Sequence, residues 1–196
     1  MSRKEEILDA ALALAFEGGP ARVTTVAIAE RLGLTQPALY RHFRSKADLW
    51  AAITDRLGRE VGANITRAEA GDGPAIDRLR ALVLGHMALI QRTPALPEIM
   101  VARDPGSDDA VVRSAMQAKM GAFQRALTTL CAEARDEGAL RSDAAHGDVA
   151  LLILGVLQSL ALRLLFNREV DAVLADASRL LELQLAAFSK DPDTHA

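Results

Sequence analysis

Polar side chains between residues 35 and 46 are the ones best suited to bind another molecule. This segment contains Gln36, Tyr40, Arg41 and Lys46. The Gln36 amide can pair with two atoms of an adenine edge, and Arg41 can pair with guanine or with a phosphate. The Tyr40 hydroxyl can reach a phosphate while its ring packs against neighbouring side chains. These residue types favour recognition of nucleic acid through hydrogen bonds and charge.

The other reactive side chains do not form the pattern of a catalytic or metal-binding site. No two of the four histidines have the spacing of metal ligands; they are His42, His86, His146 and His195. Cys131 is the only cysteine, and its surroundings predict a small buried hydrophobe in a helix. The sequence contains no glycine-rich phosphate loop. We therefore expect neither an enzyme nor a cofactor.

Two short helices must position the polar segment. Apolar spacing predicts a first helix over 25–32, and Gly33 ends it as a C-terminal glycine cap. Thr35 is expected to cap a second helix that reaches about residue 43. Pro37 falls in the first turn of that helix, where its missing N–H costs little. Two helices joined by a short turn with a glycine form a helix-turn-helix, whose second helix can enter the DNA major groove.

The second helix should turn its polar side chains outward. Leu39 and Phe43 lie four residues apart, so both should point into the core. The opposite side then carries Gln36, Pro37, Tyr40 and Arg41. Lys46 falls in the first turn of the next helix, where free backbone N–H groups and the positive dipole end suit a phosphate.

Charge is distributed unevenly along the chain. Residues 22–46 hold five basic side chains and one acidic one, a net charge of +4. Residues 47–196 hold sixteen basic and twenty-one acidic side chains, and the whole chain has a net charge of −3. A local positive field is what the release of counterions from a DNA backbone requires. The same sequence could instead form a pair of helices whose basic face is simply exposed to solvent.

The whole chain is expected to be all-α. Half of its 196 residues are hydrophobic, with only 4% aromatic, and Ala and Leu, both strong helix formers, dominate. We predict a three-helix N-terminal helix-turn-helix domain (1–46), a six-helix C-terminal bundle (47–190) and a frayed tail (191–196). After a long helix that opens on a capping box at Ser45 and Asp48, the remaining helices are expected over 75–92, 95–102, 108–137, 144–167 and 171–188.

Residues 3–50 resemble the DNA-binding domain of TetR-type (tetracycline repressor) transcriptional regulators. The run LYRHFRSKADL at 39–49 carries most of the resemblance. It also rests on Arg3, Ile7-Leu8, Ala10-Ala11, Phe16, Thr25-Val26, Ile28-Ala29 and Gly33. The chain departs from the family pattern at Leu32, where alanine is common, and over TQPA at 35–38, at the front of the second helix.

The resemblance implies a set of DNA contacts, namely Thr25, Thr35, Gln36, Tyr40, His42 and Lys46. Within it we expect Gln36 to read a base edge, and Tyr40 and Lys46 to hold the DNA backbone. His42 either touches the backbone or packs against the first helix. The resemblance also implies a homodimeric repressor on a palindromic operator, released by a small effector. The alternatives are a DNA-binding protein without a small ligand, acting architecturally or through a protein partner, and a helical enzyme or carrier.

Two further sets of residues follow from the expected C-terminal bundle. Side chains that could line the site of a small, largely apolar effector are His86, Met87, Met100, Met116, Met120, Phe123 and Gln158. Each could instead be core filler or an ordinary histidine. Apolar residues that could form a four-helix homodimer interface are Leu157, Leu160, Leu164, Leu174, Leu181, Leu185 and Phe188. These could instead belong to the core of a single chain.

The most apolar stretch, at 149–166, is expected to be a buried helix. Gln158, Ser159 and Arg163 interrupt it, and a spanning helix needs roughly 20 mostly apolar residues. The N-terminus reaches acidic residues at once and lacks an apolar signal core. We therefore expect a cytoplasmic protein that does not cross a membrane.

Overall fold

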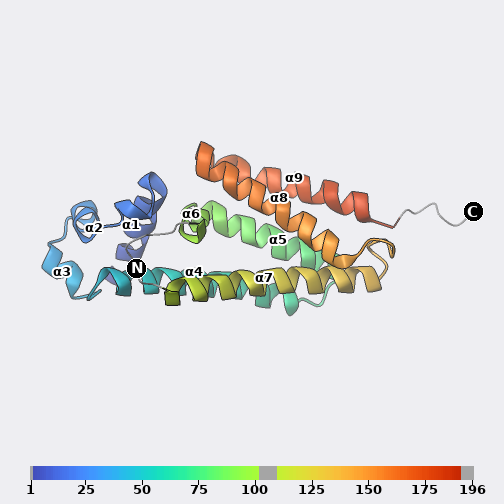
Figure 1. Ribbon diagram of the computed structural model, residues 1–196, viewed down its shortest axis with the longest axis horizontal. Helices are drawn as coiled ribbons and strands as arrows, with labels where there is room; N and C mark the ends of the chain where they lie inside the picture. The colour runs from blue at the N-terminus through green and yellow to red at the C-terminus, as the bar shows by residue number, and fades with distance from the viewer. Residues whose placement is uncertain (1, 102–109, 191–196) are drawn as a thin grey trace, which may run out of the picture. The chain divides into compact units, whose positions relative to one another are not determined.

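The computed structural model describes residues 2–101 and 110–190, and this part of the chain is helical (Figure 1). An isolated bridge between Leu140 and Ser189 is the only β-pairing in those two ranges. The all-α prediction is confirmed, and the predicted frayed tail at 191–196 lies outside the described residues. The helices are α1 (Arg3–Gly18), a 3-10 turn (Pro20–Arg22), α2 (Thr25–Leu32), α3 (Gln36–Tyr40), α4 (Lys46–Glu69), α5 (Ala75–Arg92), α6 (Leu96–Val101), α7 (Ala110–Asp136), α8 (His146–Asn167) and α9 (Asp171–Phe188).

The chain divides into two compact units. The first comprises Met1–Arg59 and Thr93–Ala118, and the second Glu60–Arg92 and Lys119–Ala196. Helices α4 and α7 each contribute residues to both units. The boundary that we predict after residue 46 separates DNA binding from effector binding, and it stays a prediction.

Capping side chains begin the helices of the first unit. The Ser2 hydroxyl accepts a hydrogen bond from the Glu5 N–H at 3.3 Å. The Ser45 hydroxyl accepts from the Asp48 N–H at 3.0 Å, and the Asp48 carboxylate accepts from the Arg44 N–H at 3.1 Å. Both hydroxyls thus satisfy backbone donors that a helix start leaves free. The cap at Ser45 is the predicted one, but its return bond comes from the Arg44 N–H and not from the Ser45 N–H.

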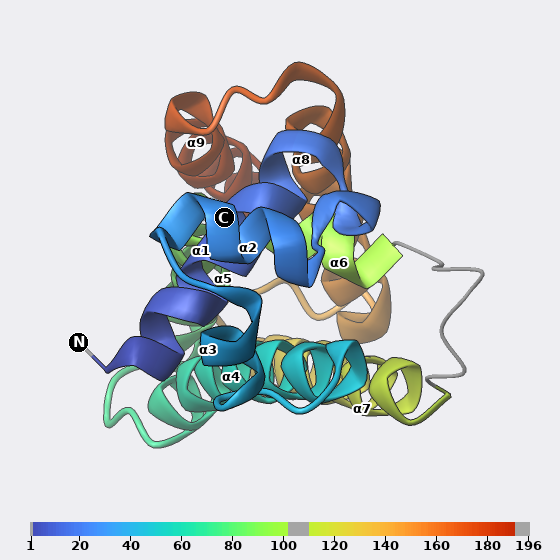
Figure 2. The ribbon, with the colours of Figure 1, turned by 90° about the vertical axis from the view of Figure 1, so that its left-hand side faces the viewer.

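The first three helices enclose a small apolar core, in which α1 packs against α2 and α2 against α3 (Figure 2). The start of α4 adds a buried stripe, Leu49, Ile53 and Leu57, that the sequence predicts. The fully buried side chains of this core include Ile7, Ala11, Ile28 and Leu39.

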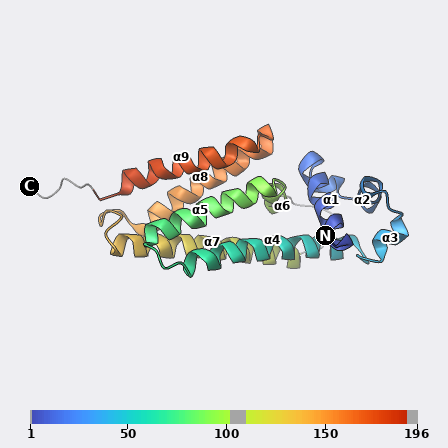
Figure 3. The ribbon, with the colours of Figure 1, turned by 180° about the vertical axis from the view of Figure 1, so that it is seen from behind.

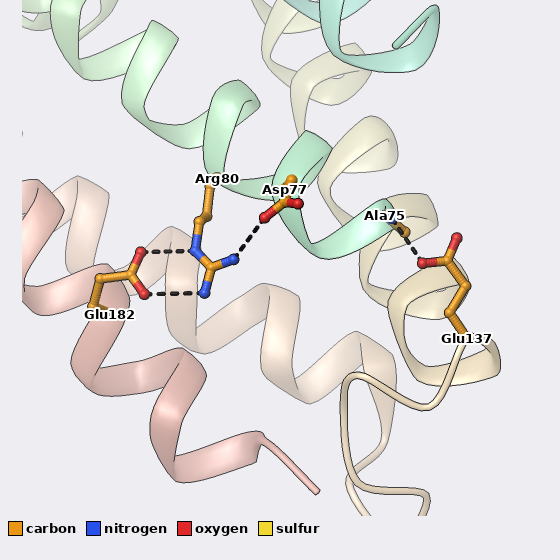
Figure 4. A network of polar contacts seen from close by, with 5 residues as sticks. All are labelled: Ala75, Asp77, Arg80, Glu137 and Glu182. Carbon is orange, nitrogen blue, oxygen red and sulfur yellow. Dashed lines mark hydrogen bonds and ion pairs between the residues drawn. The ribbon is translucent and has the colours of Figure 1, made fainter. Parts of the chain in front are cut away.

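In the second unit, α9 packs against both α5 and α8 (Figure 3). Figure 4 shows polar contacts that hold this packing: Arg80 on α5 donates to both carboxylate oxygens of Glu182 on α9, at 2.8 and 3.1 Å. Arg80 also donates to Asp77 at 2.9 Å. At the start of α5, the Ala75 N–H donates to the Glu137 carboxylate at 2.8 Å. A side chain from just after α7 therefore caps α5.

The residues that α8 and α9 expose are not the ones that we predict for the homodimer interface. Leu157, Leu160, Leu164, Leu181 and Leu185 are buried inside the single chain. They present almost no surface to a second copy, and Leu174 and Phe188 are half-buried. The choice of interface residues is thereby corrected. The physical reason is that α8 is apolar nearly all round, so its sequence does not indicate which stripe faces α9.

The exposed apolar residues of these two helices form a different set. Phe166 is 77% exposed and Leu183 65% exposed, and Leu151, Leu152 and Leu162 are exposed as well. In the described part of the chain, α8 is the one helix long and apolar enough to cross a membrane by length and composition, and 33% of its apolar window is buried. The core helix of a soluble protein has the same composition.

Helices α4 and α5 approach each other closely at Gly85. The buried Asn64 of α4 donates its amide hydrogen to the Leu82 carbonyl of α5 at 2.8 Å. A Cβ atom at Gly85 would overlap the Asn64 Oδ1 atom, so only glycine leaves that side chain in place.

Relative to Gly62→Ala, Gly85→Ala should therefore lower the free energy of unfolding by about 1–2 kcal/mol, because Asn64 must turn away and lose its bond to Leu82. The matched control is Gly62→Ala on α4, where a Cβ meets nothing within 4 Å. That change should be neutral or stabilise by up to about 1 kcal/mol, since alanine favours helix. Denaturant titration measures both, and equal effects of the two changes would contradict the assigned close approach.

Candidate nucleic-acid interface

The turn between α2 and α3 has the geometry that the sequence predicts. The Thr24 hydroxyl accepts from the Ala27 N–H at 3.1 Å and starts α2. Gly33 ends α2 in the left-handed region, with φ 62° and ψ 32°. The following Leu34 N–H reaches back to the Ala29 carbonyl at 2.8 Å, which completes the glycine-dependent helix end. Residues 24–46, with this turn at their centre, are called the reading head below.

Helix α3 turns its polar side outward. Leu39 is fully buried and Phe43 is 3% exposed, as their spacing predicts. Tyr40 is 45% exposed, and its ring therefore lies partly over the surface. The other predicted contact residues that are exposed are Thr35, Gln36, Pro37, Arg41, His42 and Lys46, while Thr25 is half-buried.

Two details of α3 differ from the prediction. The helix ends at Tyr40 rather than at residue 43, and the Phe43 N–H still bonds to the Leu39 carbonyl at 3.1 Å, so the chain continues as a turn. Thr35 precedes the helix as its cap residue, but its hydroxyl makes no capping bond. His42 is exposed, which agrees with a place on the DNA-facing surface, and its contact with the DNA backbone stays a prediction.

Fewer basic side chains of the reading head are available to bind phosphates than its sequence contains. Arg31 makes two hydrogen bonds to the Glu17 carboxylate of α1, at 2.7 and 2.5 Å. The bond from Arg31 holds the pKa of Glu17 below its usual value. This arginine is therefore already neutralised within the protein. The charge of Arg22 also acts on the Glu17 carboxylate. Among the described residues, Arg41 and Arg44 have no ion-pair partner and can face phosphates.

One further cation belongs to this surface, and the sequence does not point to it. The Lys4 ammonium lies over the Phe43 ring, 5.3 Å from its centre. Lys4 is exposed, and the contact brings a charge from α1 to the end of α3. Lys4 stands next to Arg3 in a basic N-terminal turn, and this is the one feature of the sequence that could have indicated it. Its contact with Phe43 depends on the tertiary fold.

Arg56 fastens α4 to α1 within the first unit. Its guanidinium donates to Glu5 at 3.2 Å and to Asp9 at 2.7 Å, and 24% of its side chain is exposed. The Glu5 carboxylate thus bonds Arg56, while the Glu5 N–H bonds the Ser2 hydroxyl. The contact ties α1 to α4.

The predicted effector residues fall into three groups. His86 and Phe123 lie together, with ring centres 4.4 Å apart, and Met87 is fully buried. Met120 is half-buried, whereas Gln158 is exposed on α8 and does not join the others. The side chains of Met100 and Met116 lie outside the described residues.

Other reactive groups do not suggest a second chemistry. Across residues 2–101 and 110–190, no three His, Cys, Asp or Glu side chains are grouped so that they could hold a metal ion. Cys131 is buried, and burial raises the pKa of its thiol to about 12. It is therefore a neutral, packed side chain.

Three comparisons with known proteins bear on this surface. The model of the bacterial regulatory proteins of the tetR family matches residues 7–53. Nucleoid occlusion factor SlmA of Aliivibrio fischeri (strain MJ11) is 32% identical over 100 residues, 50% of this chain and 51% of SlmA. The chain thus spans about half the length of the curated relatives that it matches.

Solved structures extend the similarity to nearly the whole chain. SmeT, the repressor of the Stenotrophomonas maltophilia multidrug efflux pump SmeDEF, is 25% identical, with a TM-score of 0.71 over 98% of this chain and 93% of SmeT. A SmeT–triclosan complex is 27% identical, with a TM-score of 0.72 over 96% of this chain and 92% of that chain. Residues 7–53 thus carry the N-terminal domain of the bacterial regulatory proteins of the tetR family, and the fold of nearly the whole chain is that of the repressor SmeT. The reading head, residues 24–46, lies inside the segment that the tetR-family model matches.

Arg56→Ala should lower the free energy of unfolding by roughly 1 kcal/mol, because two carboxylates lose a half-buried partner. Amide hydrogen exchange should become faster in α1 and stay unchanged in α9. The control is Arg59→Ala, which removes an exposed pair with Asp55 on the same helix and should cost less than about 0.5 kcal/mol. If α1 exchanges at the same rate in both variants, Arg56 does not fasten it.

Proposed function

We propose that this chain is a cytoplasmic DNA-binding transcriptional repressor that reads a palindromic operator as a homodimer. The observation that carries the proposal is the exposure of Gln36 and Tyr40 on the second helix of a helix-turn-helix, and of Arg41 directly after that helix. A helix of this kind inserts into the major groove, with half-sites one turn of DNA, ~34–36 Å, apart. The match of residues 7–53 to the tetR family supports it.

The side chains divide between base reading and backbone binding. Gln36 stands in the first turn of α3, and its exposed amide can bond an adenine edge at two points. Tyr40 and Lys46 bind phosphates, Lys46 from the first residue of α4 with the N-terminal end of the helix dipole beside it. Thr35 adds a hydroxyl that no capping bond occupies. Arg41 reads guanine or a phosphate.

The homodimer in this proposal uses the outer faces of α8 and α9. Leu151, Leu152, Leu162 and Phe166 are exposed on α8, and Leu183 is exposed on the neighbouring α9. Exposed apolar patches on soluble proteins mark interaction surfaces. A second copy related by a two-fold axis would bury the same face on both chains.

A small, largely apolar effector completes the proposed regulation. It would bind in the helices that follow the reading head and favour a dimer whose two heads no longer match the operator. SmeT has been solved with triclosan, and SmeT is a repressor of an efflux pump. These relatives support a repressor that a small molecule releases.

A second candidate function is a DNA-binding protein that a protein partner controls. The similarity to SlmA, a nucleoid occlusion factor, favours it. The two functions differ in one measurable property. Only the first predicts that a small molecule, triclosan being the first to try, lowers the affinity for operator DNA.

Binding of the full chain to DNA from its own upstream region tests the reading head. Lys46→Ala should weaken binding to all sequences and reduce the dependence of log affinity on log salt by about one, because one phosphate contact is lost. Gln36→Ala should lose roughly 5–100-fold for the operator alone and relax the preference at one base pair. The control, Lys190→Ala, removes an exposed cation after α9 and should leave operator binding unchanged. If Lys46→Ala and Gln36→Ala also bind operator DNA like the wild type, the DNA-binding surface does not include these two residues.

A further inference from the structure

His86 is a buried side chain with one hydrogen-bonding atom left over. It lies on α5 and is 5% exposed. Its Nδ1 atom is fully buried and has no hydrogen-bond partner among the described residues. Folded proteins leave very few buried polar atoms unpaired, because such an atom has lost its water without replacing it. The Nδ1 atom is therefore a place where a bound molecule would gain a hydrogen bond.

The surroundings of His86 are apolar and aromatic. The Phe123 ring of α7 lies 4.4 Å from the His86 ring, tilted by 33°. Phe123 and the neighbouring Met87 are fully buried. Burial lowers the pKa of His86 to about 4, so the imidazole is neutral at pH 7. A charged ligand that bound beside His86 would lose its hydration and would find no opposite charge on this neutral ring, which is unfavourable.

From this geometry we propose that His86 anchors a neutral, largely apolar ligand through a single hydroxyl group, with Phe123 against the body of the ligand. A hydroxyl both donates and accepts, so it satisfies Nδ1 in either neutral tautomer of the ring. A carbonyl satisfies only the tautomer with a proton on Nδ1. The proposal rests on the effector binding of the proposed function and names the chemistry of that effector.

The position of His86 also connects the ligand to the reading head. His86 follows Gly85, where α4 packs so closely that a Cβ would overlap Asn64. Asn64 bonds the Leu82 carbonyl, one turn before His86 on the same helix. Helix α4 continues from Asn64 back to Lys46. A ligand that moves this turn of α5 therefore acts on the helix that carries Lys46.

A matched pair of probes tests the anchor on the full chain. The probes are 4-propylphenol and propylbenzene, which differ by the hydroxyl alone, and 4-propylbenzoate serves as the charged analogue. Calorimetry should show the phenol binding roughly 3–10-fold more tightly than propylbenzene, as one hydrogen bond allows, and no binding of the benzoate. In protein labelled with ¹⁵N-histidine, the Nδ1 resonance of His86 should shift with the phenol and not with propylbenzene.

His86→Phe keeps an aromatic ring and removes the nitrogen. It should bind propylbenzene within about twofold of the wild type and lose the preference for the phenol. His86→Gln, which keeps a hydrogen-bonding group, should retain part of that preference. If the phenylalanine variant does not fold, the His86→Gln variant and the Nδ1 resonance of the wild type still test whether Nδ1 bonds the hydroxyl. The anchor is overturned if the wild type binds neither probe, binds both equally, or shows no shift at Nδ1.

Operator affinity, measured on the same samples, separates this proposal from the proposed function. A phenol that binds at His86 without changing operator affinity supports the anchor and contradicts its role as an effector site. Release from the operator that is identical in wild type and His86→Phe supports effector control and contradicts the anchor.

Discussion

Helix α4 is the constraint on which the rest of the structure depends, because one continuous helix belongs to both units of the chain. It runs from Lys46 to Glu69, about 36 Å at the rise of an α-helix. Its first turns are fastened to α1 by Arg56, and its later turns are fastened to α5 by Asn64. Regulation of the reading head from the second unit needs such an element.

The reading head combines two kinds of recognition in few residues. Cations and the start of α4 offer affinity for any DNA backbone, while the exposed first turn of α3 offers sequence preference. The arrangement leaves Arg41 and Arg44 without ion-pair partners in the described chain and occupies Arg31 with Glu17. These two arginines follow directly in the chain on the side chains that we propose to read bases. In the same proposal, the acidic remainder of the chain disfavours other orientations on DNA.

Local patterns predicted the features that depend on a few neighbouring residues. Gly33 needed a left-handed backbone, Ser45 capped the next helix, and the spacing of Leu39 and Phe43 turned them inward. Features that join distant residues were not predictable in this way. The pairs of Arg31 with Glu17 and of Lys4 with Phe43 depend on how helices pack. The wrong dimer face has the same cause, since both stripes of α8 are apolar and only the packing of α9 decides which is buried.

The central claim is that two copies of this reading head bind one operator together. Native mass spectrometry or sedimentation of the full chain with a palindromic operator tests it most directly, alongside the same DNA with one half-site scrambled. We predict two chains on the palindrome and a loss of ~100-fold or more in affinity for the scrambled DNA, because one head then loses its base contacts. One chain on each DNA, with equal affinity for both, would contradict binding by two heads together.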